Sequence, residues 1–101
     1  MGKLLWHIVV RPTGENVYEL QVTKTSEKLY YSGGNQKFRK AEEDMITEYF
    51  MRHGYHVFTL DETKVSAYVD ELRDKVIEDL RKQRDTYDEL IANVEARKAN
   101  G

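Results

Sequence analysis

Residues 61–100 read DETKVSAYVDELRDKVIEDLRKQRDTYDELIANVEARKAN, and this stretch decides the shape of the protein. It contains neither glycine nor proline, so it predicts one continuous helix from Asp61 to Asn100. At about 1.5 Å per residue, such a helix is on the order of 55 Å long. A compact domain of this chain length is only about 33 Å across. We therefore expect part of the helix to overhang the domain, to bend back or to meet a partner.

An apolar stripe follows this helix in steps of three and four residues. The step from Val76 to Leu80 breaks the strict heptad and is a stutter. The half up to Leu80 is wide enough to face a core, and the polar run 81–85 separates it from a narrower second half. The stripe consists of Val65, Val69, Leu72, Val76, Leu80, Gln83, Tyr87, Leu90 and Val94.

The narrower half has two interpretations. It could be a solvated extension that frays, or it could contact another chain through Tyr87, Leu90, Ile91 and Val94. We favour the contact, because aliphatic and aromatic side chains gathered in one stripe are poor choices for a solvent-facing surface. The chain accordingly divides into a compact domain, residues 1–84, and a helical segment, residues 85–101, that overhangs or contacts a partner.

Four segments predict strands. The first, Lys3–Arg11, is apolar in both of its alternating sets, which is typical of a central strand covered on both faces. Val17–Thr23 alternates between apolar and polar residues, as a half-exposed strand does. Lys28–Ser32 and Tyr55–Leu60 are short third and fourth strands.

Between the third and fourth strands, Phe38–His53 predicts an amphipathic helix. Its apolar residues recur at the helical period, and Gly54 is a suitable residue to follow its end. The element order is then β-β-β-α-β-α, an α+β fold of two layers. A right-handed crossover makes the fourth strand parallel to the first, which predicts a four-stranded mixed sheet with strand order 3-2-1-4. Either the long helix or a second subunit covers the other face of the first strand.

The glycine-rich turn at residues 32–36 leads into three bases. The backbone N–H groups at a helix N-terminus attract anions, and bases there are unfavourable for the helix itself, so they indicate a phosphate contact. The alternative is a loop whose bases pair with Glu42, Glu43 or Asp44. Tyrosines on neighbouring strands could stack on single-stranded bases, or they could fill the core or a protein interface. The candidate nucleic-acid surface consists of Lys24, Lys28, Tyr30, Tyr31, Lys37, Arg39 and Lys40.

No motif for catalysis or cofactor binding is present. Cysteine is absent. The three histidines, His7, His53 and His56, do not have the spacing of a zinc site, and no nucleophile motif accompanies them. We therefore expect no metal, no cofactor and no enzymatic activity. The apolar run Leu4–Val10 is too short for a signal peptide or a membrane span, which indicates a soluble cytoplasmic protein.

The leading hypothesis is a small non-enzymatic protein–protein interaction module. Its long helix would contact a protein partner or a second copy, and small viral inhibitors or modulators of larger assemblies offer an analogy for this size and composition. The alternative hypothesis is a nucleic-acid-binding domain that uses the basic segment 32–40 and the tyrosines of the sheet.

Overall fold

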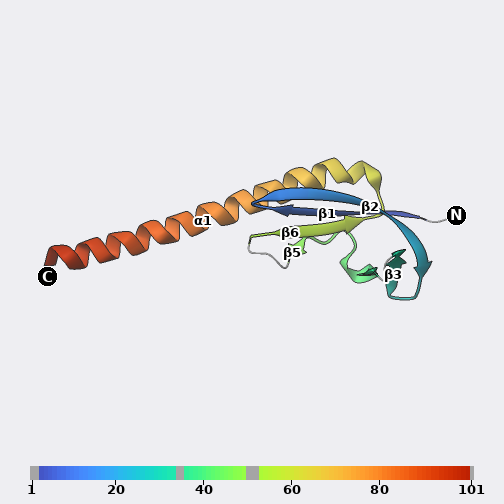
Figure 1. Cartoon of the computed structure of the whole chain (residues 1–101), viewed down its shortest axis with the longest axis horizontal. Helices are drawn as coiled ribbons and strands as arrows, with labels where there is room; N and C mark the ends of the chain where they lie inside the picture. Colours follow the sequence, from blue (N-terminus) through green and yellow to red (C-terminus); the bar gives the residue numbers. More distant parts are fainter. Residues whose placement is uncertain (1–2, 34–35, 50–52, 101) are drawn as a thin grey trace.

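The computed structural model describes residues 3–33, 36–49 and 53–100. In these residues, six strands form a curled antiparallel sheet in the order β4-β3-β2-β1-β6-β5, and the long helix α1 follows them (Figure 1). The molecule is 71 Å long and only 23 and 20 Å in its other dimensions, because α1 extends far beyond the sheet. The elements are β1 (Leu4–Arg11), β2 (Gly14–Thr25), β3 (Leu29–Ser32), β4 (Gln36–Arg39), a 3₁₀ turn η2 (Lys40–Glu42), β5 (Thr47–Glu48), β6 (Tyr55–Thr59), a second 3₁₀ turn η3 (Glu62–Lys64) and α1 (Val65–Asn100).

The prediction of a four-stranded mixed sheet is wrong. The predicted strands do lie side by side in the expected order, since β3, β2, β1 and β6 are neighbours. However, β6 is antiparallel to β1, with Ile8 opposite Val57, and β4 and β5 add an edge strand on each side. The parallel orientation depended on a crossover helix, and the described residues between β3 and β6 form none.

The predicted helix Phe38–His53 is wrong as well. The described part of this segment forms β4, η2 and β5, while residues 50–52 lie outside the described residues. Asp44 and His53 have φ angles of 59° and 60°, in the left-handed region that a right-handed helix does not contain. The apolar residues do not share one face either: Phe38 packs on one face of the sheet and Ile46 on the other.

One face of the sheet is covered by the first half of α1. Ile8 and Val10 of β1 and Val57 of β6 form a buried cluster with Leu72 and Val76 of the helix. The alternating pattern of β1 explains this arrangement, because Ile8 and Val10 project to the same side. The helix therefore lies along the central strand pair of the sheet.

The other face of β1 is covered by the sheet itself. The pairing of β2 with β3 shifts register between Val22 and Lys24, and such an irregularity bends a strand. The β3–β4 hairpin thereby curls over the inner face, where Leu5, Val22, Tyr30 and Phe58 are buried together. This answers the question that the sequence left open, since both faces of β1 are covered within one chain.

The start of α1 follows its local chemistry. The Asp61 carboxylate accepts a hydrogen bond from the backbone N–H of Thr63 at 3.0 Å, which caps the η3 turn, and α1 proper begins at Val65. Just before it, the Thr59 hydroxyl at the end of β6 accepts a hydrogen bond from the backbone N–H of Asp61 at 3.1 Å.

Candidate functional site

The first half of α1 is tied to the body by polar contacts as well as by its apolar face. The Tyr68 hydroxyl donates to Asp44 at 3.0 Å, and Arg73 donates two hydrogen bonds to Glu15 of β2 at 2.9 and 2.6 Å. Burial and the Asp44 carboxylate raise the pKa of Tyr68 to about 12, so its hydroxyl stays a donor at neutral pH. These contacts hold the helix in one orientation on the sheet.

The second half of α1 projects away from the sheet (Figure 1). Three of the four predicted partner-contacting side chains are exposed there: Tyr87 by 54%, Ile91 by 55% and Val94 by 46%. The side chain of Leu90 lies outside the part of the structure that can be described. Large apolar groups left in water on a projecting helix are a feature of contact surfaces.

The exposed surface begins earlier than the sequence indicated. Ile77 and Leu80, which the sequence assigned to the core-facing half, are 46% and 40% exposed. The Tyr55 hydroxyl donates to Asp79 at 2.5 Å, so the body ends beside this part of the helix. The sequence carries no local signal for this exposure, because Leu80 continues the same apolar stripe as the buried Leu72 and Val76.

The predicted basic and aromatic residues gather on the β2-β3-β4 part of the sheet. Lys24, Tyr31 and Lys37 lie directly opposite one another on these three strands. The ammonium groups of Lys24 and Lys37 lie 5.6 and 6.0 Å from the centre of the Tyr31 ring, within the range of cation–π attraction. This Lys–Tyr–Lys row is a surface to which an anion with an aromatic group could bind.

Tyr30 has a different environment from Tyr31. Its side chain is buried against Phe58, and its hydroxyl donates to Glu43 at 2.8 Å. Burial and this carboxylate raise the pKa of Tyr30. Glu43 accepts from Tyr30, and Asp44 pairs with Lys64 at 3.5 Å, so two of the three acids expected to neutralise the bases of segment 32–40 have other partners.

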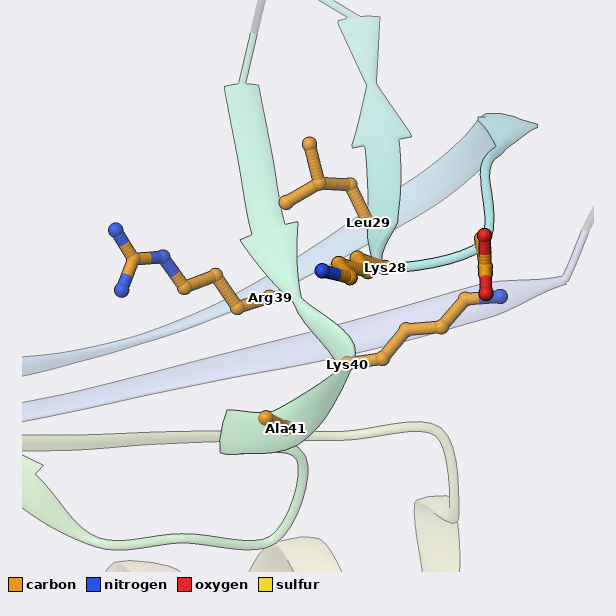
Figure 2. A pocket seen from close by; sticks show the side chains of 6 residues that line it. Lys28, Leu29, Arg39, Lys40 and Ala41 are labelled. Atoms are coloured by element: carbon orange, nitrogen blue, oxygen red, sulfur yellow. The ribbon is translucent and has the colours of Figure 1, made fainter.

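The remaining predicted bases line a hollow at the base of the β3–β4 hairpin. Its volume is about 660 Å³, and Arg39 and Lys40 extend from it in opposite directions (Figure 2). Opposite directions follow from the alternation of side chains at the end of β4. The hollow is lined by Glu27, Lys28, Leu29, Arg39, Lys40 and Ala41.

The histidines are separated into two environments. His7 Nε2 and His56 Nδ1 are hydrogen-bonded at 2.9 Å on the inner face, where the His7 ring also contacts Phe38 and Tyr18. Burial and the neighbouring His56 lower the pKa of His7 to about 4, so both rings are neutral at pH 7. His53 lies 3.9 Å from Asp79, whose same oxygen accepts the Tyr55 hydroxyl. Residues 3–33, 36–49 and 53–100 contain no group of three side chains suited to a metal ion.

Comparison with protein-family models, with curated proteins and with solved structures finds no match to this chain. Within the described ranges, no helix is long and apolar enough to cross a membrane. The function must therefore be inferred from the geometry of the surfaces.

Proposed function

We propose that the protein is a small, non-enzymatic protein–protein interaction module that presents the C-terminal half of α1 to a partner. This proposal rests on three apolar side chains of the projecting helix: Tyr87, Ile91 and Val94. Each of them is about half exposed to solvent. Burying such groups stabilises a complex by roughly 25 cal/mol per Å² of apolar area. An interface core built from them has the composition common in protein complexes.

A modulator or inhibitor of a larger assembly is the role that we propose for this module. The sheet and the first half of α1 would act as a rigid base, because the buried cluster around Leu72 and Val76 fixes the helix direction. A preorganised helix loses little conformational entropy on binding. We also propose a cytoplasmic location, since a cysteine-free chain is compatible with a reducing compartment.

The experiment compares the intact chain with two charge variants, Ile91→Asp and Ala96→Asp. Ala96 lies on the opposite side of the same exposed helical segment, so its variant is a matched control for the added charge. Light scattering measures the mass of each protein, and mass spectrometry identifies what is recovered with it. We expect a complex that Ile91→Asp removes and Ala96→Asp keeps. A monomer in all three cases, with identical recovered proteins, contradicts the proposal.

The Lys–Tyr–Lys row supports a second candidate function, binding of single-stranded nucleic acid. A base could stack on Tyr31 while Lys24 and Lys37 contact the flanking phosphates. Fluorescence anisotropy of labelled oligonucleotides at about 50 mM salt, where phosphate contacts are strong, tests this candidate. Binding should weaken steeply with salt and should be lost in Lys24→Gln/Lys37→Gln but kept in Lys82→Gln. Absence of any complex at low salt rejects it.

A further inference from the structure

The exposed apolar residues of α1 form a regular seam. Ile77, Leu80, Tyr87, Ile91 and Val94 are the large hydrophobic side chains exposed on the described part of the helix. With Arg84 included, they are spaced by three, four, three, four and three residues. This is the a/d spacing of a coiled coil, which keeps one seam of a helix against a partner helix. We call these six residues the α1 seam: Ile77, Leu80, Arg84, Tyr87, Ile91 and Val94.

The surface of the seam is shaped for a side chain of another helix. A hollow of about 250 Å³ lies between Ile77, Leu80, Arg81 and Arg84. These four residues are spaced i, i+3, i+4 and i+7, which is the arrangement of a hole in knobs-into-holes packing. A knob from a partner helix at this position would lie opposite Leu80.

The seam has nearly the same character when it is read in either direction. Its two ends are aliphatic, Ile77 and Val94, and so are the next two positions, Leu80 and Ile91. The central positions are Arg84 and Tyr87. A second copy running in the opposite direction would therefore place Val94 against Ile77, Ile91 against Leu80 and Tyr87 against Arg84. Each layer pairs an a position with a d position, as two antiparallel helices require.

We infer that the partner of α1 is a second copy of this chain, bound through the α1 seam in antiparallel orientation. This inference rests on the proposed protein–protein interaction function and identifies the partner in that interaction. The central layer decides the direction. In a parallel pair, Arg84 would face Arg84 of the partner subunit, and two like charges would be buried together. In the antiparallel pair, each guanidinium lies against the ring of the partner's Tyr87, a favourable cation–π arrangement.

One pair of charges beside the seam favours the same direction, whereas Asp74 and Glu95, at the equivalent positions near its ends, would meet as like charges. Arg81 and Asp88 flank the seam one heptad apart, and neither forms an ion pair within the residues that the structure describes. In the antiparallel pair, Arg81 of each copy lies near the partner's Asp88, which gives two interchain ion pairs. In a parallel pair, Arg81 would lie near the partner's Val76 and Asp88 near the partner's Gln83. Both neighbours are uncharged, so neither ion pair would form.

The body of the protein leaves room for the second helix on the β2 side. Arg73, which continues the seam by one step toward the N-terminus, donates to Glu15 of β2, so the seam faces this side of the sheet. Val17 of β2 lies opposite Ile8, on the face that α1 covers, yet it is 46% exposed. The end of the partner's helix would pass over this strand and cover Val17.

Cysteine cross-linking of the full chain tests both the partner and the direction. The natural chain has no cysteine, so each introduced thiol is the only one present. The variants are Leu80→Cys, Ile91→Cys and, outside the seam, Ala96→Cys. Residues 80 and 91 of one helix are about 16 Å apart. A disulfide requires Cα atoms closer than about 7 Å, so it cannot form between these positions within one chain.

Under oxidising conditions, we expect a mixture of Leu80→Cys and Ile91→Cys to form a disulfide dimer that contains one copy of each. The yield of disulfide dimer should be at least about tenfold lower for each variant alone. It should be equally low when Ala96→Cys is mixed with either of the other variants, because in these cases the two thiols lie too far apart to form a disulfide. Efficient cross-linking of each single variant with itself indicates a parallel dimer and overturns the inferred direction. Equal cross-linking of all mixtures indicates random collision and overturns the dimer.

Charge reversal without cysteine gives an independent readout. Sedimentation equilibrium over a micromolar to millimolar range measures the dimer dissociation constant. We expect Arg81→Glu to raise this constant by roughly tenfold and Arg81→Glu/Asp88→Arg to restore it, while circular dichroism confirms an unchanged helix content. A monomeric natural chain at every concentration overturns the inference. If Ile91→Asp then abolishes binding of a different protein, the proposed interaction function still stands.

Discussion

The hydroxyl of Tyr55 on β6 donates a hydrogen bond to Asp79 of α1 at 2.5 Å. Asp79 raises the pKa of this hydroxyl to about 12, so the bond persists at physiological pH. The contact marks the boundary between two parts of one helix. Before it, Leu72 and Val76 are buried against the sheet; after it, the large apolar side chains of Tyr87, Ile91 and Val94 are exposed.

Tyr55→Phe should lower the free energy of unfolding by about 1–2 kcal/mol, because it removes a hydrogen bond to a carboxylate and keeps the ring. The matched control is Tyr87→Phe, which removes a hydroxyl that accepts a hydrogen bond from the Gln83 side chain on the same projecting helix, at 3.2 Å. Urea unfolding at low protein concentration measures both variants. Equal losses in the two variants would contradict a boundary at Asp79.

Leu72→Ala should destabilise the monomer by about 2–5 kcal/mol, since Leu72 is fully buried between α1 and the sheet. Ile91→Ala should change monomer stability by less than about 0.5 kcal/mol, because half of its side chain is already in water. The same urea experiment at micromolar concentration compares them. A large loss in Ile91→Ala at this concentration would mean that the second half of α1 packs on its own body.

Stability should decrease as the pH falls from about 6.5 to about 4. The folded state holds the pKa of His7 near 4, whereas an unfolded histidine has a pKa near 6.5. Between these values the unfolded chain binds a proton that the folded chain does not, so acid favours unfolding. His56, whose pKa burial also lowers, acts in the same direction.

Thermal unfolding of the natural chain and of His7→Phe across this pH range measures the effect. The variant keeps an aromatic ring in the cluster and removes one titrating group, so its stability should depend less on pH. Carboxylates titrate in both proteins, and the difference between the two curves therefore isolates the histidine. Parallel curves would show that His7 does not titrate with folding.

The sequence predicted those parts of the fold in which the local conformational preference of the residues agrees with the structure that tertiary packing requires. The helix over 65–100 has helix-forming residues throughout, and Asp61 supplies a cap. The alternation in β1 and β2 matches strands that are covered on one or both faces. β1, β2 and β3 also lie side by side in the predicted order, because hairpins join these sequential strands by short turns.

Segment 38–53 could not be predicted, because its spacing matches a helix by coincidence. Phe38 and Ile46 are both core residues, yet they belong to clusters on opposite faces of the sheet. Lys37, Arg39 and Lys40 were noted as unfavourable for a helix N-terminus, and they lie in or beside a strand, where that penalty does not exist. Once this helix was assumed, the parallel orientation of the last strand followed, and both were wrong.

The candidate site was predicted in part. The exposure of Tyr87, Ile91 and Val94 agrees with the stripe that the sequence analysis assigned to a partner, although the contact itself stays a prediction. Ile77 and Leu80 were missed because the stripe up to Leu80 was assigned to the core. Only the position of the sheet determines where along a continuous helix the buried face ends, and no local pattern encodes that position.

Amide hydrogen exchange along α1, measured at micromolar and at millimolar concentration of the natural chain, tests the central claim most directly. An unpartnered helical extension frays and exchanges fast, whereas a paired helix is protected. Pairing of two copies predicts that protection of residues 77–94 rises with concentration, and that Ile91→Asp removes this rise while Ala96→Asp keeps it. Equally fast exchange of these residues at both concentrations would contradict the claim.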